Sequence, residues 1–428
     1  MNLMQLHDYF KDSSGVVTDS RKLIQDCFFI ALRGENFDGN QFAEAAIEKG
    51  AKYALVDRPE IAQKNERLIL VENTLQSLQE LAQYHRKNLK AKIIALTGSN
   101  GKTTTKELIR NVLATKFNTK ATKGNFNNHI GVPITLLDFD VNTEIGIVEM
   151  GANHKKEIEF LCQLAQPDIG LITNFGQAHL EGFGGIEGVI QGKSEMYEYL
   201  SKARKAIILN IDDPLQRKWL SYNPHYTFGE DSSADCRVKF LKRKQKPLAL
   251  TIKNKIIESQ LYGEYNFSNI ATAVALGKFF DLSLEHINEG ISSYVSNNNR
   301  SQSLLKGNKR IILDAYNANP SSMKASITGF IDNKKNKGCV ILGDMFELGS
   351  LTDKAHQEIV DQLESTDIDS ILIVGKHFFK TQSRDPRVQS FQSLEEIKDY
   401  LIQNPIKETD ILIKGSRGMA LETILNAL

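Results

Sequence analysis

Nine short runs of aliphatic residues constrain the fold of this chain more than any other feature of its sequence. They are rich in Ile, Val and Leu and show no polar alternation: KYALV (52–56), KIIALT (92–97), IGIVEM (145–150), IGLIT (169–173), AIILNI (206–211), RIILDA (310–315), GCVILGD (338–344), SILIV (370–374) and DILIKG (410–415). Such runs are typical of strands buried on both faces of a parallel sheet. Because helix-like stretches such as 74–89 and 352–365 stand between them, we predict an α/β fold with crossover helices.

Chain length and two breaks in this pattern indicate three domains. At roughly 100–200 residues per domain, 428 residues suggest two to four domains. The basic stretch 86–92 precedes a strong strand candidate, and the polar stretch 296–305 is turn-prone. We therefore predict domains over 1–88, 89–299 and 300–428, with a β-meander over 236–262 inside the second.

Charge and cysteine content exclude several classes of protein. Lys and Arg number 53 and Asp and Glu 52, so there is no basic excess of the kind that nucleic-acid binders carry. No run approaches the roughly 18 apolar residues of a membrane span, and charges interrupt the N-terminus where a signal peptide needs an apolar run. We expect a cytoplasmic protein with no nucleic-acid partner and no membrane insertion, whose four scattered cysteines are buried or free thiols.

The stretch KIIALTGSNGKTTTKELI joins a predicted strand to a predicted helix through a loop that suits a nucleotide phosphate. Glycines let the backbone wrap the phosphate, and the helix N-terminus adds a favourable dipole. Lys102 would reach the β- and γ-phosphates, and the Thr103 hydroxyl would ligate Mg²⁺. The usual spacing requires glycine at position 96, where Leu96 stands. The loop alone predicts nucleotide binding by its residues Gly98, Ser99, Asn100, Gly101, Lys102, Thr103 and Thr104, and leaves motor, kinase, ligase and nucleotide sensor open.

Residues 174–196 form a second unusual stretch, with six glycines around His179 and Lys193. Glycine loses more backbone freedom on folding than any other residue. Ordering such a stretch is therefore costly, which raises the question of why His179 and Lys193 stand in it; by themselves, a structural histidine and a surface lysine of a helix remain possible interpretations.

The shortened loop TGSNGKTT resembles that of the Mur ligase family, whose relatives include folylpolyglutamate synthase. Similar segments continue along most of the chain: TDSRK to NQF (18–42), GNFNNHIGVPITLL (124–137), VEMGANHKKEI (148–158), ITNFGQAHLEGF (172–183), GEYNFSNIATAVAL (263–276), DAYNANPSSM (314–323), LGDMFELG (342–349) and IKGSRGMALE (413–422). The resemblance implies a small α/β N-terminal domain that binds a UDP-sugar, a central P-loop ATPase domain with a parallel sheet, and a Rossmann-like C-terminal domain that binds the incoming dipeptide.

The YNANP, GDMFELG and KGSRGM segments resemble the branch of that family that adds a dipeptide. This implies an ATP-dependent ligase that joins D-alanyl-D-alanine to UDP-N-acetylmuramoyl-tripeptide through an acyl phosphate, acting as a monomer. Phosphorylation gives the unreactive carboxylate a good leaving group. It also brings two anions together, so metal ions and cationic side chains must offset their repulsion.

The resemblance also implies the residues that would meet this requirement. Thr103, Glu149, His179 and Lys193 would hold Mg²⁺, with Lys193 carbamylated by CO₂; a histidine would be an unusual ligand for this oxygen-preferring ion. The groups implied to act on the reacting atoms are Lys102, His179, Lys193 and Arg300. The further contacts implied are Asn269, Arg300 and Asp314 to ATP; Asn127, Asn128, Tyr316, Asn317 and Asn319 to the substrates; and Ser20 and Arg21 to UDP.

Three alternatives remain open. The ligase that adds the preceding amino acid carries a DNPR motif, and SRDPR (383–387) lacks its asparagine and does not directly follow a strand candidate. Folylpolyglutamate synthase should lack the UDP-binding domain, yet a long segment precedes the P-loop strand here. A non-catalytic nucleotide-binding protein would not need Glu149, His179 and Lys193 together.

Overall fold

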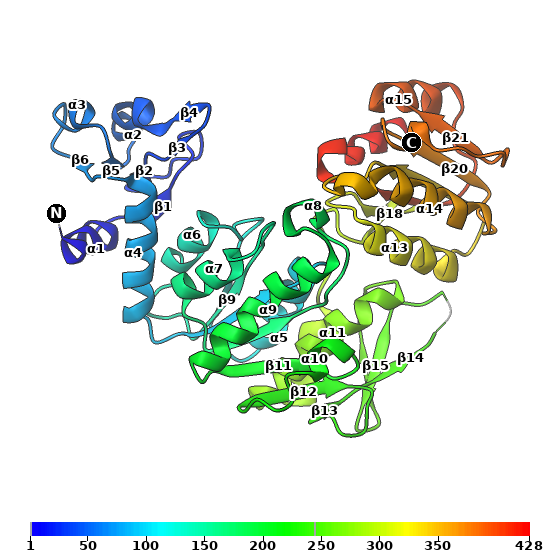
Figure 1. Ribbon diagram of the computed structural model, residues 1–428, viewed down its shortest axis with the longest axis horizontal. Coiled ribbons are helices and arrows are strands. Elements are labelled where there is room, and N and C mark those ends of the chain that lie inside the picture. The colour runs from blue at the N-terminus through cyan, green and yellow to red at the C-terminus, as the bar shows by residue number, and fades with distance from the viewer. Residues whose placement is uncertain (1, 244) are drawn as a thin grey trace.

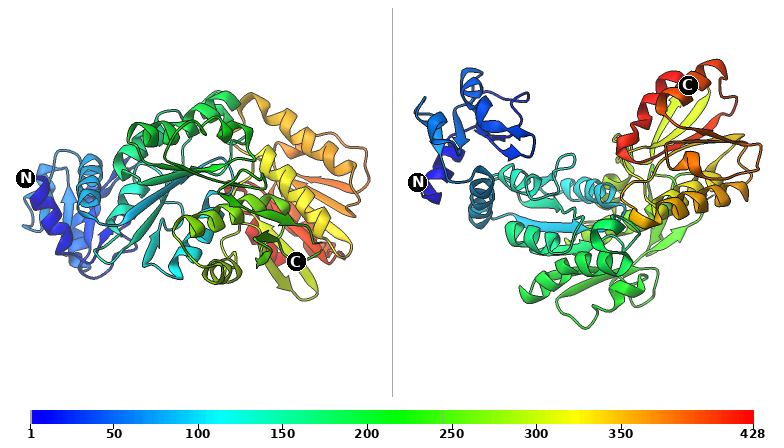
Figure 2. Two further views of the ribbon diagram at one scale, coloured as in Figure 1. Left: turned by 90° about the horizontal axis from the view of Figure 1, so that it is seen from below. Right: turned by 45° about the horizontal axis from the view of Figure 1, so that its top comes forward.

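A computed structural model describes residues 2–243 and 245–428, which form three principal sheets that follow one another along the chain. The N-terminal sheet and the C-terminal sheet lie at opposite ends of the molecule, with the largest sheet between them (Figures 1 and 2). All nine predicted strands are present, so the α/β prediction is confirmed. The four cysteines are buried free thiols. No helix in the described ranges has both the length and the apolar character that a membrane crossing requires.

The N-terminal sheet has four parallel strands in the order β1-β2-β5-β6. One face packs on α2, and the other packs on α1 and α4. The strands and the small β3–β4 hairpin are β1 (Val16–Val17), β2 (Phe28–Ile30), β3 (Arg33–Gly34), β4 (Phe37–Asp38), β5 (Tyr53–Val56) and β6 (Leu68–Leu70). The helices are α1 (Leu3–Lys11), α2 (Ala43–Glu48), α3 (Pro59–Ala62) and α4 (Thr74–Asn88).

The central sheet has seven parallel strands in the order β13-β12-β11-β10-β7-β9-β8. They are β7 (Lys92–Thr97), β8 (Thr119–Ala121), β9 (Ile145–Glu149), β10 (Ile169–Ile172), β11 (Ala206–Asn210), β12 (His225–Gly229) and β13 (Cys236–Arg237). Alternate side chains of β7 enter different cores, because successive residues of a strand point to opposite faces. Ile93 and Ala95 join the core with α4, α6, α7 and α9, whereas Ile94 and Leu96 join the core with α5, α11 and α12.

The helices around this sheet are α5 (Lys102–Ala114), α6 (Gly131–Leu137), α7 (Glu157–Ala165), α8 (Leu180–Phe183), α9 (Ile186–Lys202), α10 (Pro214–Arg217), α11 (Phe267–Phe279) and α12 (Leu284–Ser292). The strands β10, β7 and β9 are direct neighbours and run the same way. Their carboxyl ends therefore meet at one edge, where α/β proteins place their ligands. The phosphate loop follows β7, Glu149 ends β9, and the loop with His179 follows β10.

Two segments differ from the sequence-based expectation. Within the predicted meander 236–262, β13 instead extends the central sheet in parallel with β12, and only β14 (Lys239–Leu241), β15 (Ala249–Ile252) and β16 (Lys255–Glu258) form an antiparallel meander. In the turn-prone stretch 296–305, β17 (Gln302–Lys306) pairs antiparallel with β18. Edge strands of this kind have one strand neighbour and need no apolar run. A search for apolar runs therefore does not predict them.

The C-terminal sheet has six strands in the order β17-β18-β22-β19-β20-β21, parallel except for β17. The helices α13 and α14 cover one face, and α15 with the C-terminal 3₁₀ turns covers the other. The elements are β18 (Lys309–Asp314), α13 (Pro320–Asn333), β19 (Gly338–Gly343), α14 (Thr352–Glu364), β20 (Ser370–Val374), β21 (Val388–Phe391), α15 (Leu394–Gln403) and β22 (Asp410–Lys414).

The junction between the first two sheets is a packed interface. In α4, Arg86 is 9% exposed and donates to the backbone oxygens of Ala165 (3.0 Å) and Gln166 (2.9 Å). Its guanidinium also pairs with Asp168 at 2.9 Å. One continuous core includes Leu6 and Phe28 of the first sheet region together with residues of the central sheet. The stretch 86–92, which the sequence indicates as a break between domains, therefore begins with a residue that binds the two sheet regions together.

Arg86→Ala should loosen this junction. The change removes the donor to the carbonyls of Ala165 and Gln166. It also leaves Asp168 with Lys205 at 2.8 Å and the N–H of Ile93 at 3.0 Å as its partners. We expect the free energy of unfolding to fall by about 3 kcal/mol, measured from urea unfolding curves. Arg67→Ala, at an exposed arginine of the same region, should cost less than about 0.5 kcal/mol. Equal costs for the two variants would contradict the assigned role of Arg86.

Candidate active site

A cavity of about 720 Å³ is lined by residues of the central and C-terminal sheet regions. It brings together most of the residues singled out in the sequence. Those that line it are Ser99, Asn100, Gly101, Lys102, Thr104, Asn127, Asn128, Glu149, His179, Asn269, Arg300, Asp314, Tyr316, Asn317 and Asn319. Gly98, Thr103 and Lys193 lie outside its lining, and so do Ser20 and Arg21 of the N-terminal region.

The phosphate loop offers the N-terminus of α5 to the cavity. Gly101 precedes this helix at φ 78°, and a Cβ there would lie 2.4 Å from Asn269 Oδ1. No side chain caps the helix, so its first-turn N–H groups are available to an anion. The N–H groups of Ser99 and Asn100 are not, because they donate to the backbone oxygen (3.1 Å) and Oδ1 (3.0 Å) of Asn174. The sequence did not single out Asn174, which fixes the loop from the end of β10.

Lys102 folds back onto its own loop. Its Nζ donates to the backbone oxygens of Gly98 (2.6 Å) and Ser99 (3.3 Å). Burial lowers the pKa of Lys102 to about 8, with Glu149 opposing the shift and the positive charge of Arg300 adding to it. Among the described residues, no anionic group lies at hydrogen-bond distance from this ammonium, and a bound phosphate would supply one.

Two oxygen atoms near the loop fit a magnesium ion. Glu149 is 1% exposed; its Oε1 accepts from Asn127 Nδ2 at 2.9 Å. Its Oε2 and the buried Thr103 Oγ1 accept no hydrogen bond within the described residues, and the nearest cation to Oε2 is Lys106 Nζ at 3.9 Å. No cluster of three His, Cys, Asp or Glu side chains occurs in that part of the chain. Mg²⁺ commonly takes one or two protein ligands and completes its shell with phosphate oxygens and water.

Lys193 of α9 is fully buried behind the cavity wall. Its Nζ donates to the backbone oxygen of Ala152 at 3.2 Å and lies 5.0 Å from the centre of the Phe183 ring. Burial, followed by the charge of Lys102, holds the pKa of this lysine well below its usual range. Burial of this kind favours the neutral amine over the ammonium.

His179 stands in the left-handed backbone region at φ 54° and lines the cavity. Its Nδ1 contacts the carboxylate of Glu347, which comes from the segment after β19. Hydrogen bonding to His179 lowers the pKa of Glu347. The histidine therefore meets the C-terminal sheet region, a contact that the sequence did not predict.

Glycines of the stretch 174–196 mainly allow protein to pack on protein. A Cβ at Gly188 would lie 1.8 Å from the backbone oxygen of Phe183, and one at Gly192 would lie 2.4 Å from its ring. The ring of Phe183 can therefore pack close to α9, beside Lys193, because Gly188 and Gly192 present no side chains there. Although glycine-rich, the stretch contributes to the core through Phe183, which is 3% exposed.

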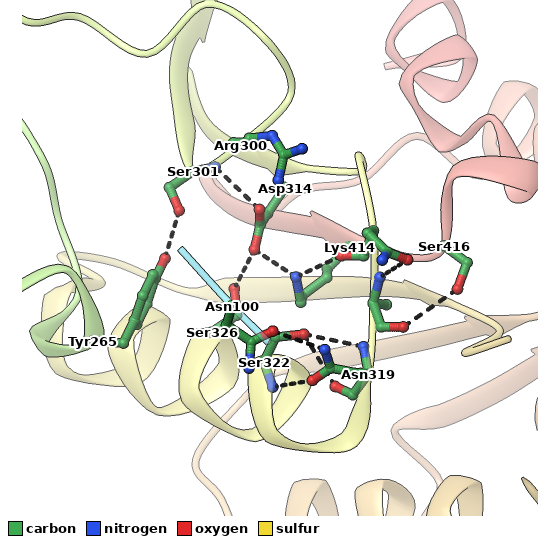
Figure 3. Close-up of polar contacts among 12 residues, drawn as sticks. Asn100, Tyr265, Arg300, Ser301, Asp314, Asn319, Ser322, Ser326, Lys414 and Ser416 are labelled. Carbon is green, nitrogen blue, oxygen red and sulfur yellow. Dashed lines mark hydrogen bonds and ion pairs between the residues drawn. The ribbon is translucent and has the colours of Figure 1, made fainter. Parts of the chain in front are cut away.

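The C-terminal sheet contributes an ion pair and an unused guanidinium (Figure 3). Asp314 Oδ2 pairs with Lys414 Nζ at 2.6 Å, and its Oδ1 accepts from the N–H of Ser301 at 3.1 Å. The guanidinium of Arg300 lies 3.6 Å from the centre of the Tyr316 ring, and its buried Nε donates to no described residue. Arg300 thus has a free donor at the cavity.

Three predicted substrate contacts also have local structural roles. Asn127 Nδ2 orients Glu149, as described above. Asn128 Oδ1 accepts from the N–H groups of Ile130 (3.1 Å) and Gly131 (2.9 Å) at the start of α6. Asn317 Oδ1 accepts from the next backbone N–H at 2.9 Å. In the N-terminal region, Arg21 is exposed and pairs with Asp19 at 2.9 Å.

Residues missed by sequence reasoning include Asn174, Tyr265, Ser321 and Glu347, all of which line the cavity. Each lies inside a segment that resembles the family, but such a segment does not say which of its side chains faces the site. In the SRDPR segment, Arg387 donates to the carbonyls of residues 364, 366 and 368 and pairs with Asp385. Its bonds hold a loop, which supports discounting it as a DNPR motif.

Three family models match consecutive parts of the chain. The model described as Mur ligase family, catalytic domain, matches residues 12–86. The Mur ligase middle domain matches residues 96–277, and the Mur ligase, glutamate ligase domain, matches residues 299–417.

Individual proteins are similar over nearly the whole chain. The UDP-N-acetylmuramoyl-tripeptide–D-alanyl-D-alanine ligase of Bacillus subtilis (strain 168) is 37% identical over 97% of this chain and 93% of its own length. The structure of MurF from Acinetobacter baumannii is 29% identical with a TM-score of 0.85, covering 99% of this chain and 98% of that one. MurF ligase from Thermotoga maritima, in complex with ADP, is 26% identical with a TM-score of 0.84 and covers 98% and 97%. These likenesses confirm the predicted three-domain architecture.

The pH dependence of stability should report the buried ammonium of Lys102. Its pKa is about 8 in the folded chain and near the ordinary 10.5 when unfolded. Between these values the unfolded chain binds more protons, so stability rises with pH. The free energy of unfolding of the wild type, minus that of Lys102→Met, should therefore grow by about 2 kcal/mol from pH 8 to pH 10.5. Urea unfolding without nucleotide measures it. The control is Lys22→Met, at an exposed lysine: the free energy of unfolding of the wild type minus that of this variant should not change with pH. If the difference for Lys102→Met did not change with pH either, the lowered pKa of Lys102 would be contradicted.

Proposed function

We propose a specific reaction for this chain, which belongs to the Mur ligase family. The reaction is ATP-dependent amide-bond formation between D-alanyl-D-alanine and UDP-N-acetylmuramoyl-tripeptide, which yields the pentapeptide precursor of peptidoglycan. The observation that supports it most is the similarity over nearly the full length to ligases of that name. The cavity supports it too, because it faces the phosphate loop with cationic and amide groups of the C-terminal region.

The first step would transfer the γ-phosphoryl group of ATP to the peptide carboxylate. The N-terminus of α5 would hold the phosphates through its uncapped N–H groups. Lys102 would leave the carbonyls of Gly98 and Ser99 and turn to the phosphate oxygens, which compensate its charge better than neutral carbonyls do. Arg300, with its unused Nε, would offset the charge that develops between the two anions.

The residues that would hold Mg²⁺ are Thr103 and Glu149, joined by His179 and carbamylated Lys193. When bound, the ion neutralises phosphate charge and aligns the phosphate oxygens. Asn127 would keep Glu149 in place by its hydrogen bond to Oε1. The contact between His179 and Glu347 would orient the imidazole as the C-terminal domain closes.

Carbamylation of Lys193 would turn a buried amine into an anion. The lone pair of neutral Nζ attacks the carbon of CO₂, an N–C bond forms, one C=O π bond becomes an oxyanion, and a proton leaves to water. Burial and the lowered pKa support this because they favour the unprotonated amine, which is the form that reacts with CO₂. An anion would also pair with the cations around the cavity, whereas an ammonium would be repelled by Lys102.

The second step would let the dipeptide amine attack the acyl phosphate and release phosphate. Residues 300–428 would bind D-alanyl-D-alanine through Tyr316, Asn317 and Asn319, and Asp314 would contact the ribose of ATP. Residues 89–299 would hold ATP with Asn269 packed against Gly101. Residues 1–88 would bind UDP through Ser20 and Arg21, with Asn128 contacting the substrate. We further propose that the chain acts in the cytoplasm as a monomer and binds no nucleic acid.

Phosphate release with defined substrate pairs tests the proposed reaction. With ATP and Mg²⁺, we expect release only when UDP-N-acetylmuramoyl-tripeptide and D-alanyl-D-alanine are both present. Release with a single amino acid in place of the dipeptide would instead indicate the preceding ligase. Absence of release with every pair would indicate a non-catalytic nucleotide-binding protein. Lys102→Met should abolish release, whereas Arg67→Ala should retain it.

Lys193 carbamylation can be observed directly with ¹³C-labelled bicarbonate. We expect a carbamate carbonyl resonance in the wild type that is missing from Lys193→Met and retained in Lys202→Met, at the C-terminal end of the same helix. Removal of CO₂ should lower turnover, and bicarbonate should restore it. A wild-type spectrum without the resonance would refute carbamylation and leave the proposed ligase reaction intact.

A further inference from the structure

The backbone of Asn100 is held entirely within the central domain. Its N–H donates to Asn174 Oδ1 at 3.0 Å. Its carbonyl oxygen accepts from Thr173 Oγ1 at 2.6 Å and from Asn174 Nδ2 at 3.0 Å. The end of β10 therefore fixes this residue of the phosphate loop before any ligand binds.

The side chain of Asn100, in contrast, is bonded to the C-terminal domain. Its Nδ2 donates to Ser321 Oγ at 3.0 Å, and its Oδ1 accepts from Asn319 Nδ2 at 2.7 Å. Figure 3 shows Asn100 beside Asn319 at the N-terminus of α13. Both ends of the carboxamide are thus used by residues some 220 positions away in the sequence. We call Asn100, Asn319 and Ser321 the amide bridge.

Capping of α13 determines which way each amide in the bridge faces. Asn319 is the N-cap of this helix, and its Oδ1 accepts from the N–H of Ser322 at 2.9 Å. Since only an oxygen can accept there, Nδ2 of Asn319 must face Asn100. Asn100 then presents its oxygen to Asn319 and its nitrogen to Ser321. The orientation of the bridge is therefore a consequence of the helix cap.

A glycine makes room for the bridge. A Cβ at Gly176, in the loop after β10, would lie 2.9 Å from Asn100 Nδ2 and 3.0 Å from Ser321 Oγ. Any side chain there would press on both partners at once. This explains one glycine of the stretch 174–196 by a contact between two domains, with no ligand involved.

We propose that the amide bridge docks the C-terminal domain on the phosphate loop, with Asn100 acting as a positioning residue through its side chain. The proposal rests on the proposed function, because docking matters only where two domains supply the reacting groups. The helix α13 begins at Pro320, the last residue of the YNANP segment (316–320), which is proposed to bind the dipeptide. The bridge therefore ties the position of the incoming amine to the residue two before Lys102. The Asn100 carboxamide can reach Asn319 and Ser321 at the start of α13 only when the phosphate loop has this conformation.

A pair of isosteric substitutions tests the bridge. In Asn100→Asp, the carboxylate still accepts from Asn319 Nδ2. Ser321 Oγ loses the donor Asn100 Nδ2, and its hydroxyl, which donates to Asn319 Oδ1 in the wild type, can turn to donate to the new carboxylate. In Asn319→Asp, the helix cap is retained, because Asp is a favoured N-cap, and Asn100 can turn its amide to donate to the new carboxylate. In the double variant two carboxylates replace a 2.7 Å hydrogen bond and repel each other.

We expect strong non-additivity between the two substitutions. The kcat/KM for D-alanyl-D-alanine in the double variant should fall at least about tenfold below the product of the two single effects. The deficit should shrink as pH falls, because protonation of one carboxylate removes the repulsion. Small-angle X-ray scattering of the nucleotide-free protein should show a larger radius of gyration for the double variant alone. An independent effect of each residue on ligand binding would move none of these readouts.

The matched control is Asn125→Asp combined with Asn319→Asp. Asn125 lines the same cavity, and within the described residues its side chain makes no hydrogen bond to the bridge. This pair therefore adds equal charge and should be additive. A bridge double variant whose effect equals the product of the singles within about twofold, with unchanged scattering, would overturn the proposal.

Gly176→Ala provides a second arm should the double variant fail to fold. It adds no charge, yet its methyl group should widen the same interface and raise the radius of gyration. Unchanged scattering together with unchanged kcat/KM in Gly176→Ala would also overturn the proposal. Scattering needs no substrate. A wild type that releases no phosphate with any pair would therefore refute the proposed function while scattering still decides on the bridge.

Discussion

Parallel pairing of β10, β7 and β9 is the constraint on which the rest of the structure depends. The ladder bonds between these strands force three loops to leave the sheet at one edge. One loop carries Lys102, the second begins at Glu149, and the third contains His179. A parallel pair needs a long crossover connection, so these groups are distant in sequence and adjacent in space. Without this register, the phosphate loop would still lead into a helix N-terminus, but Glu149 and His179 would not lie beside it.

Buried lysines surround that edge and differ in how well they are compensated. Lys106 donates to Thr122 O at 2.6 Å and pairs with Glu107, and Lys414 pairs with Asp314. Burying an unpaired ammonium costs far more than burying a paired one. Lys193 has a single carbonyl at 3.2 Å. Among these three lysines, the ammonium form of Lys193 is therefore the least compensated, which favours chemistry on its neutral amine over a role as an ammonium.

The sequence was most informative where a local pattern decides the outcome. Strands such as β7 and β19 have both faces buried, so their apolar runs predict them directly. The short strand β8 and the edge strand β17 have little apolar content and were missed. The loop between β7 and α5 was likewise predicted from its glycines and from the strand and helix that flank it. Partners such as Asn174 and Ser321 were not, because their role exists only once residues 70 to 220 positions apart have met. The stretch 86–92 was interpreted as a break between domains for the same reason, because the backbone acceptors of Arg86 lie about 80 residues away in the sequence.

The two junctions between domains are built differently, and this determines which distance within the molecule is fixed by packing. Arg86 and a shared core join the first two domains. The second junction passes through Asn299 and Ser301, two non-glycine residues in the left-handed region at φ 57° and 49°. The C-terminal domain instead meets the central one across polar contacts such as the hydrogen bond from Asn319 to Asn100. Hydrophobic packing therefore sets the distance from the N-terminal sheet to the phosphate loop. A substrate that contacts both Arg21 and Lys102, as proposed, would have to match that distance in length.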